Sequence, residues 1–374
     1  MSMPPLSLYV HLPWCVKKCP YCDFNSHARA SIPEDDYLIS LLRDLDQDLK
    51  YVQGRKIHSL FFGGGTPSLM SGPFYLRFMD ALRARIEFEE NAEVTLEANP
   101  GASDAKHFQD YAKAGINRVS IGAQSFQDKQ LLALGRIHSA EQIPRAVDSL
   151  RNVGISNYNI DLMHGLPDQT VSLALQDLKS AMALEPAHLS WYQLTIEQNT
   201  EFFSKPPVLP EDDLLWQIIE QGSELLSANG FKHYEVSAFS KPGMQSRHNL
   251  NYWHYGDYIG LGAGAHSKVS DDSGRLLRYR KSRMPEAYMA DRVSYRVGEE
   301  YVEKDAQVFE FMMNALRLRE GVEENVFEQR TQLRLNDIDA QLKDLRKEGL
   351  MREHRIQLSD KGFLFLNSVL ERFL

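Results

Sequence analysis

The alternation of short apolar runs with amphipathic stretches is the feature that most restricts the fold of this 374-residue chain. Six runs have the length and the apolar, β-branched and aromatic content of buried strands, at residues 6–12, 58–62, 93–97, 118–122, 158–163 and 189–195. Apolar residues three and four apart predict helices between them, at residues 35–51, 73–86, 104–114, 140–153 and 169–184. Because parallel strands need helical crossovers, this order predicts an α/β fold with a parallel sheet rolled into a partial, TIM-like (β/α)6 barrel.

The barrel is predicted to occupy residues 1–240. Its last part contains a long amphipathic helix at 211–229, which ends at a glycine, and a further strand at 234–239. A connecting segment is predicted at 241–298, and the change to charged helical sequence marks a smaller C-terminal domain at 299–374. The chain is long enough for both domains to have apolar cores.

The C-terminal domain is predicted to be mainly helical. Charged helices at 304–319 and 337–348 precede a short hairpin at 351–358 and a closing helix at 361–373. This order resembles a winged-helix module. Acidic residues are interleaved throughout, whereas nucleic-acid-binding modules are basic, so the prediction is a structural or partner-binding role.

The charge balance of the chain bears on the class of partner that it can bind. The chain has 42 Lys and Arg against 51 Asp and Glu, a formal net charge of -9, which argues against a nucleic-acid partner. No apolar run is long enough for an integral membrane segment, and the N-terminus lacks the pattern of a signal peptide. We therefore expect a cytoplasmic protein.

All three cysteines of the chain fall within eight residues, at Cys15, Cys19 and Cys22. They follow the first predicted strand directly, so three soft thiolates in one loop can converge on a single thiophilic centre. A cluster of four irons held by three thiolates leaves one iron without a protein ligand, and that iron can bind a small molecule. The spacing therefore indicates an iron–sulfur cluster with an open iron.

Two other interpretations of the cysteines remain. A structural Cys3His zinc site could be completed by His11 or His27. Zinc sites usually take ligands from two separated hairpins or knuckles, which disfavours this alternative. A disulfide with one free thiol is disfavoured further, because the odd number of clustered cysteines fits a reducing compartment.

Polar and glycine residues follow several of the predicted strands. In a parallel barrel the carboxyl ends of the strands meet at one mouth, where ligands bind. Taken singly, each polar residue here is as often a helix cap or a loop anchor as a ligand contact, and a glycine triplet can be only a tight turn. Together they form a consistent series, with members Gly64, Gly65, Thr66, Glu97, Gln124 and Asp161.

The motifs carry a family resemblance. The cysteine spacing C-x3-C-x2-C matches the signature of the radical S-adenosylmethionine superfamily. Over nearly the whole chain the sequence resembles the oxygen-independent coproporphyrinogen III oxidase-like family within it, through the segments YVHLPWCVKKCPYCDFN, FFGGGTPSL, EANP, SIGAQSF and NIDLMHGLP. The resemblance implies a radical S-adenosylmethionine barrel with a 4Fe-4S cluster on Cys15, Cys19 and Cys22, and S-adenosylmethionine on the open iron.

The resemblance also assigns S-adenosylmethionine contacts residue by residue. Tyr9, Gly64 and Glu97 match contacts for a first molecule. The positions that contact a second molecule in the oxidases correspond to Tyr21, Gly65, Thr66, Gln124, Arg136 and Asp161.

One departure from the family pattern argues against the oxidase branch. The oxidases have a fourth cysteine two positions after the third, where this chain has Phe24. The segment beginning His248-Asn249-Leu250-Asn251-Tyr252 resembles instead the H-N-x-x-Y element of the heme chaperone branch. That branch implies heme as a further ligand, with His248 and Tyr252 as candidate contacts. Without the resemblance, a histidine beside aromatic rings ordinarily indicates packing, and two other histidines nearby are equal candidates, His254 and His266.

Two functional hypotheses follow from the resemblance. The first is a heme chaperone without coproporphyrinogen oxidase activity, which hands heme to acceptor apoproteins, membrane-associated respiratory proteins among them; a homodimer is compatible with it. The second is an oxygen-independent coproporphyrinogen III oxidase of porphyrin biosynthesis, a radical S-adenosylmethionine decarboxylase. Methyl or sulfur transfer to RNA would require a basic surface and further catalytic cysteines, and the sequence has neither.

Overall fold

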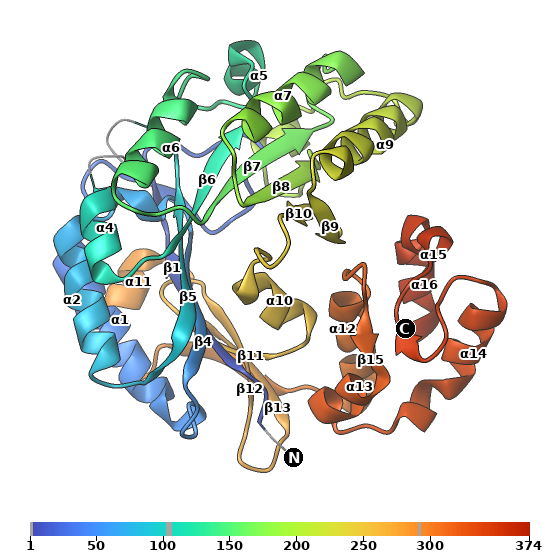
Figure 1. Cartoon of the computed structure of the whole chain (residues 1–374). Coiled ribbons are helices and arrows are strands. Elements are labelled where there is room, and N and C mark those ends of the chain that lie inside the picture. Colours follow the sequence, from blue (N-terminus) through green and yellow to red (C-terminus); the bar gives the residue numbers. More distant parts are fainter. Residues whose placement is uncertain (1–2, 102–106, 291–292) are drawn as a thin grey trace.

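A single curved sheet organises the larger part of the molecule. The computed structural model describes residues 3–101, 107–290 and 293–374. Within these residues the main sheet has twelve strands in the order β14-β13-β12-β11-β1-β4-β5-β6-β7-β8-β10-β9. Figure 1 shows helices along the outer face of this sheet and a separate group of C-terminal helices, drawn in orange and red, at one side.

Six adjacent parallel strands form the centre of the sheet, and each matches one of the predicted runs. Both faces of these strands are largely buried, which explains why their sequences are continuous apolar runs. The prediction of an α/β fold with a parallel sheet is confirmed. The strands are β1 (Leu6–Leu12), β4 (Ile57–Gly64), β5 (Phe88–Ala98), β6 (Arg118–Gln124), β7 (Tyr158–His164) and β8 (His188–Gln193).

Helices cross over between these strands where the sequence predicts them. The first three residues of the predicted helix 104–114 lie outside the described residues, and the helix there begins at Phe108. None of the helices in the described ranges is both long enough and apolar enough to cross a bilayer. The barrel helices are α1 (Glu34–Asp48), α2 (Gly72–Arg83), α4 (Phe108–Ala114), α5 (Asp128–Ala133), α6 (Gln142–Asn152), α7 (Val171–Ala183), α8 (Glu201–Ser204) and α9 (Asp212–Ala228).

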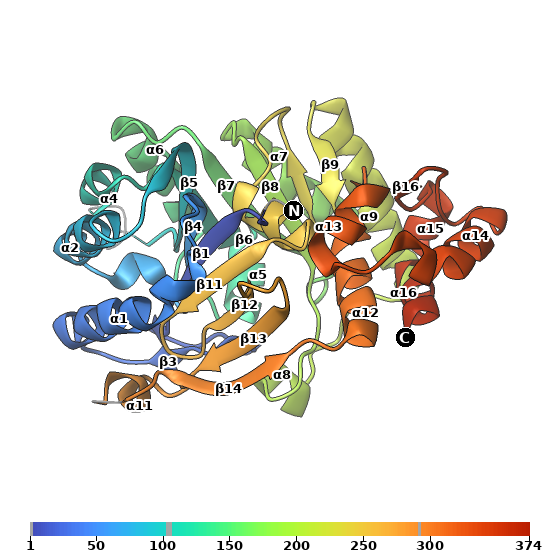
Figure 2. The ribbon, with the colours of Figure 1, turned by 90° about the horizontal axis from the view of Figure 1, so that it is seen from below.

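The sheet extends beyond the six central strands at both of its edges. At one edge the predicted strand 234–239 is instead a hairpin, β9 (Lys232–Glu235) and β10 (Ala238–Ser240), because residues 236 and 237 form a turn. At the other edge β11 pairs in parallel with β1, and three antiparallel strands follow (Figure 2). The sequence pattern predicts no strand there. We call these four the added strands: β11 (Asp257–Leu261), β12 (His266–Ser270), β13 (Leu276–Lys281) and β14 (Arg296–Tyr301).

The C-terminal helices have an apolar core of their own, which includes Phe311, Phe327 and Leu345. The helix at Glu324–Thr331 is not predicted, and the predicted closing helix 361–373 is divided into short pieces because the chain leaves helical geometry at Phe365. Short helices α10 (Arg247–Trp253) and α11 (Pro285–Met289) lie in the preceding segment. The C-terminal elements are α12 (Lys304–Ala315), β15 (Val322–Glu323), α13 (Glu324–Thr331), α14 (Asp339–Lys347), β16 (Arg355–Ile356), α15 (Asp360–Leu364) and α16 (Leu366–Leu370).

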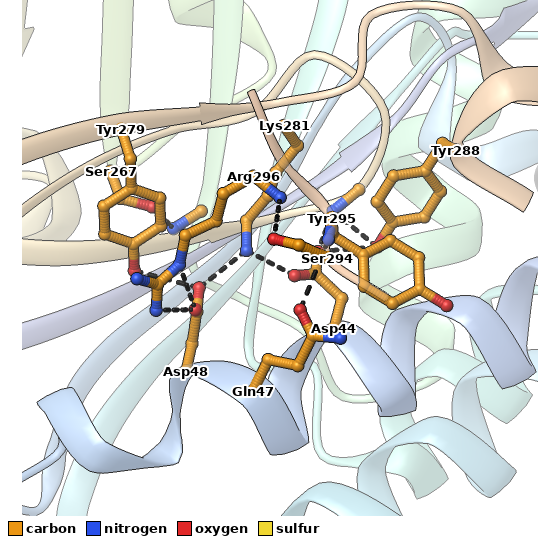
Figure 3. Close-up of polar contacts among 12 residues, drawn as sticks. Asp44, Gln47, Asp48, Ser267, Tyr279, Lys281, Tyr288, Ser294, Tyr295 and Arg296 are labelled. Carbon is orange, nitrogen blue, oxygen red and sulfur yellow. Dashed lines mark hydrogen bonds and ion pairs between the residues drawn. The ribbon is translucent and has the colours of Figure 1, made fainter. Parts of the chain in front are cut away.

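A buried ionic network connects α1 to two of the added strands, β13 and β14 (Figure 3). Lys281 of β13 donates to Asp44 and Asp48 of α1, at 2.7 Å from the Asp48 carboxylate. Arg296 of β14 reaches the other oxygen of Asp48 at 2.6 Å, and the Tyr288 hydroxyl donates to Asp44 at 2.7 Å. Lys281 and both carboxylates are inaccessible to solvent, so each buried charge has an opposite charge beside it.

Candidate functional site

The carboxyl ends of the central strands surround a cavity of about 160 Å³. Every residue predicted to hold the cluster or S-adenosylmethionine lines this cavity, with the exception of Tyr9. Tyr9 lines a second cavity, of about 690 Å³, which shares Phe24, Gly64 and Glu97 with the first. The structure therefore brings together residues that are up to 146 positions apart in the sequence, from Cys15 to Asp161. These residues are Cys15, Cys19, Tyr21, Cys22, Gly64, Gly65, Thr66, Glu97, Gln124, Arg136 and Asp161.

The cysteine loop begins at β2 (Trp14–Cys15) and ends at β3 (His27–Ala28), which pair in parallel. Each sulfur has a polar neighbour. The Thr66 hydroxyl donates to Cys15 Sγ at 3.5 Å, and the Arg136 guanidinium donates to Cys19 Sγ at 3.6 Å. The third pair is Cys22 Sγ and Ser26 Oγ, at 3.9 Å.

The three thiols fit an iron–sulfur cluster better than a single metal ion. All three are free and line the same cavity. In the parts of the chain that are described, no three Cys, His, Asp or Glu side chains lie close enough together to bind one ion. Both candidate fourth zinc ligands are already hydrogen-bonded. His11 has one ring nitrogen on the Tyr9 hydroxyl and the other on the Asn25 carbonyl, and His27 has Nε2 on Asn25 Oδ1 at 3.2 Å. The donor set thus consists of three thiols that face one cavity, which suits a larger thiophilic group.

Two glycines allow the end of β4 to lie against the cysteine loop. Gly64 has a φ of 117°, and a Cβ at this position would lie 2.6 Å from the His11 ring. A Cβ on Gly65 would lie 2.5 Å from the Trp14 carbonyl oxygen. The Gly65 amide instead donates to Leu12 O at 2.8 Å, so the glycine triplet is held directly against the start of the cluster loop.

Glu97, at the end of β5, lies between the two cavities. The Gly64 amide donates to its carboxylate at 3.2 Å. Burial, with a smaller contribution from the negative charge of Asp161, raises the pKa of Glu97 to about 8. In the ligand-free protein this carboxyl is therefore mainly protonated at pH 7.

We expect Glu97→Gln to stabilise the ligand-free protein at alkaline pH. The folded pKa of Glu97 lies above its unfolded value, so its effect on stability becomes unfavourable as the pH rises from about 4.5 through about 8. A neutral amide does not ionise, so it avoids this loss of stability, and its oxygen still accepts the hydrogen bond from the Gly64 N–H. Thermal unfolding of the apoprotein should therefore give a higher Tm for Glu97→Gln than for wild type at pH 9, and little difference at pH 5.

The matched control is Glu90→Gln, because Glu90 lies on the same strand and is exposed. Its Tm should follow that of the wild type at every pH. Equal pH profiles for Glu97→Gln and wild type would show that the Glu97 carboxyl does not titrate as described.

Two polar residues on the far side of the cavity are held by neighbouring side chains. Asp161 accepts hydrogen bonds from Ser120 at 3.0 Å and from Asn159 at 2.6 Å. Gln124 ends β6 with a φ of 69° and accepts a hydrogen bond from the Tyr192 hydroxyl at 2.8 Å. These bonds orient both side chains toward the cavity before any ligand is present.

Asn99 and Tyr192 also line the cavity, although the sequence analysis assigns neither a role. Asn99 donates to the Thr66 hydroxyl at 3.2 Å and accepts from the Arg136 guanidinium, so it connects the neighbours of Cys15 and Cys19. Both residues lie at or just beyond the end of a central strand. The expectation that ligand contacts lie at the carboxyl ends of the barrel strands, which identified Glu97, could therefore have identified them as well.

The two candidate heme residues are neighbours, but only one of them reaches a cavity. Tyr252 lines the second cavity, whereas His248 is buried beside β4 and lines neither cavity. Both ring nitrogens of His248 are hydrogen-bonded, Nδ1 to Ser59 Oγ at 2.9 Å and Nε2 to the Tyr252 hydroxyl at 3.0 Å. In this arrangement His248 has no free nitrogen for an iron.

Comparison with known proteins agrees with the site. Residues 9–178 match the model of the Radical SAM superfamily, and residues 302–365 match the HemN C-terminal domain. The chain is 52% identical to the protein named heme chaperone HemW in Escherichia coli (strain K12), over 100% of this chain and 99% of that protein. This chain belongs to the HemW family. A HemW of Bacillus subtilis (strain 168) is 32% identical, over 98% of this chain and 99% of its own length.

A solved structure supports the fold. The structure of coproporphyrinogen III oxidase (HemN) from Escherichia coli, described as a radical SAM enzyme, superposes with a TM-score of 0.83. The match covers 99% of this chain and 90% of that chain at 24% sequence identity, so it establishes the shared fold. The superfamily match implies a 4Fe-4S cluster and S-adenosylmethionine as the cofactors of this HemW-family chain.

Proposed function

We propose that this chain binds heme and delivers it to acceptor proteins, and that a 4Fe-4S cluster and S-adenosylmethionine assist this function. The observation that carries the proposal is the similarity along the whole chain to proteins named heme chaperone HemW. The cavity of about 690 Å³ beside the cysteine cavity supports it, because its volume is typical of sites for small organic molecules.

In this proposal Cys15, Cys19 and Cys22 hold the cluster, and the fourth iron binds S-adenosylmethionine. When bound, such a cluster can supply an electron to the sulfonium of S-adenosylmethionine. The donors from Thr66 and Arg136 stabilise negative charge on two of the sulfurs. The S-adenosylmethionine contacts that we propose are Tyr9, Tyr21, Gly64, Gly65, Thr66, Glu97, Gln124, Arg136 and Asp161.

Phe24 favours heme handling over decarboxylation. It stands where the related oxidases have a fourth cysteine, and it lines both cavities. A phenyl ring has no ionisable proton, so it can replace that cysteine only as a packing surface. An apolar side chain therefore stands among the residues that the two cavities share, where the oxidases have a thiol.

We further propose a cytoplasmic location, with membrane-associated respiratory proteins among the acceptors. Three unpaired thiols in one loop are suited to a reducing compartment. The class of acceptor rests on the family resemblance.

The test compares heme handling with porphyrin chemistry in one preparation. We expect the anaerobically reconstituted protein to bind hemin at one per chain and to restore oxidase activity to heme-depleted respiratory membranes. We expect no decarboxylation of coproporphyrinogen III when S-adenosylmethionine and a reductant are supplied. Turnover of coproporphyrinogen III, or failure to bind hemin, would overturn the proposal.

A further inference from the structure

The second cavity has a lining suited to a flat, apolar ring. At the end shared with the first cavity it is bounded by Phe24, Gly64 and Glu97. Farther out, the rings of Tyr252 and Tyr258 meet edge to face, with centroids 4.6 Å apart. The rest of the wall comes from β1, from the cysteine loop, and from β12, β13, β14 and the loops beside them. Aromatic walls of this kind contribute large apolar contact areas to a bound ring.

One side chain in this cavity is available to ligate iron. His266, the first residue of β12, is exposed, and no hydrogen bond to its ring occurs within the described ranges. Histidine and tyrosine both occur as axial heme ligands. The other such side chains in the lining are already hydrogen-bonded within the chain, namely Tyr9, His11, Tyr252 and Tyr258.

Two arginines supply positive charge at the same wall. Arg280 donates through Nε to the Val297 carbonyl at 3.1 Å, and Arg283 donates through Nε to Asn25 Oδ1 at 3.3 Å. Neither guanidinium has a carboxylate partner among the described residues, although the chain carries a net charge of -9. Their terminal nitrogens can therefore bind the carboxylates of a ligand in this cavity.

The strand register places the imidazole beside an arginine. His266 of β12 lies directly opposite Arg280 of β13, so their side chains share one face of the sheet. The neighbours of Arg280 on β13, Tyr279 and Lys281, point toward α1 and enter the buried ionic network (Figure 3). Because side chains alternate along a strand, this network orients Arg280 toward the opposite face.

We propose that the second cavity is the heme site, in which His266 ligates the iron and Arg280 and Arg283 bind the two propionates. This inference rests on the proposed function and specifies where and how the heme is held. It places the heme on the side of Phe24 and Glu97 away from the cysteines, with one edge toward the S-adenosylmethionine contacts.

The experiment titrates the reconstituted full-length protein with three probes: hemin, iron-free protoporphyrin IX and hemin dimethyl ester. Protoporphyrin IX retains the propionates and lacks the iron, whereas the dimethyl ester retains the iron and lacks the propionate charges. Binding is followed by the porphyrin absorption difference spectrum. The variants are His266→Ala and Arg280→Ala, which replace exposed side chains and are expected to fold.

We expect His266→Ala to weaken hemin binding at least tenfold, to shift the Soret band, and to leave protoporphyrin IX binding unchanged. Added imidazole should restore the Soret position, which a merely structural defect would not allow. Arg280→Ala should weaken hemin and protoporphyrin IX about tenfold, the loss of one charge-assisted contact, and leave hemin dimethyl ester unchanged.

The matched control is His254→Ala. His254 lies outside this cavity, and its Nδ1 is hydrogen-bonded to Leu250 O at 2.8 Å, so hemin binding should be that of wild type. A wild-type protein that binds hemin, together with a His266→Ala variant of unchanged affinity and spectrum, would overturn this site and leave the proposed function standing. Absence of hemin binding by the wild type would overturn both.

Discussion

Replacement of Cys19 by Ser should yield a colourless protein with almost no bound iron after anaerobic reconstitution. The chain has three cysteines and no fourth that could substitute. A serine hydroxyl is a harder and far less acidic ligand than a thiol, so the cluster would be held by two thiolates. Iron analysis and the visible absorption of the cluster measure the loss, and S-adenosylmethionine binding should fall with them because the open iron is gone.

The control for this substitution is Ser26→Ala, which removes the hydroxyl beside Cys22 and leaves all three thiols in place. It should retain the iron content of the wild type. Because Cys19 lies in a partly exposed loop, the circular dichroism spectrum of Cys19→Ser should also match the wild type. Unchanged iron content in Cys19→Ser would contradict the assignment of the three cysteines.

The central strands could be predicted because each one is an apolar run of strand length that can be recognised from the local sequence. Residues 6–12 coincide with β1 at both ends, since the run is apolar on both faces and bounded by prolines. The same reasoning places polar residues such as Glu97 and Asp161 at one mouth, because parallel strands share a carboxyl edge. This part of the site follows from topology alone.

The added strands could not be predicted in this way. In β13, Arg278 and Arg280 alternate with Tyr279 and Lys281, and both sets look like exposed polar sequence. Lys281 is buried because Asp44 and Asp48 lie beside it, 237 and 233 positions away in the sequence. The state of the His248 nitrogens likewise depends on a distant residue, Ser59. Such pairings belong to tertiary structure and leave no local signal.

The buried pairing at Lys281 predicts the largest effect on stability. Lys281→Met preserves much of the side-chain volume but removes a fully buried cation from between Asp44 and Asp48. Asp48 keeps Arg296, whereas the Asp44 carboxylate loses its cationic partner. Removal of one partner from a buried pair costs about 3 kcal/mol or more, so urea denaturation at pH 8 should show a loss of that size.

The pH dependence and two further variants separate this explanation from a simple packing defect. Burial raises the pKa of Asp44 to about 6 even with Lys281 present, and removal of Lys281 raises it further. Asp44 is therefore protonated at pH 5, and the loss of stability in Lys281→Met should shrink as the pH falls from 8 to 5. Adding Asp44→Asn should recover part of the stability at pH 8, because it removes the uncompensated charge. Lys56→Met, which breaks an exposed pair with Glu87, should cost less than about 1 kcal/mol; an equal cost at both lysines would show that the buried network does not stabilise the added strands.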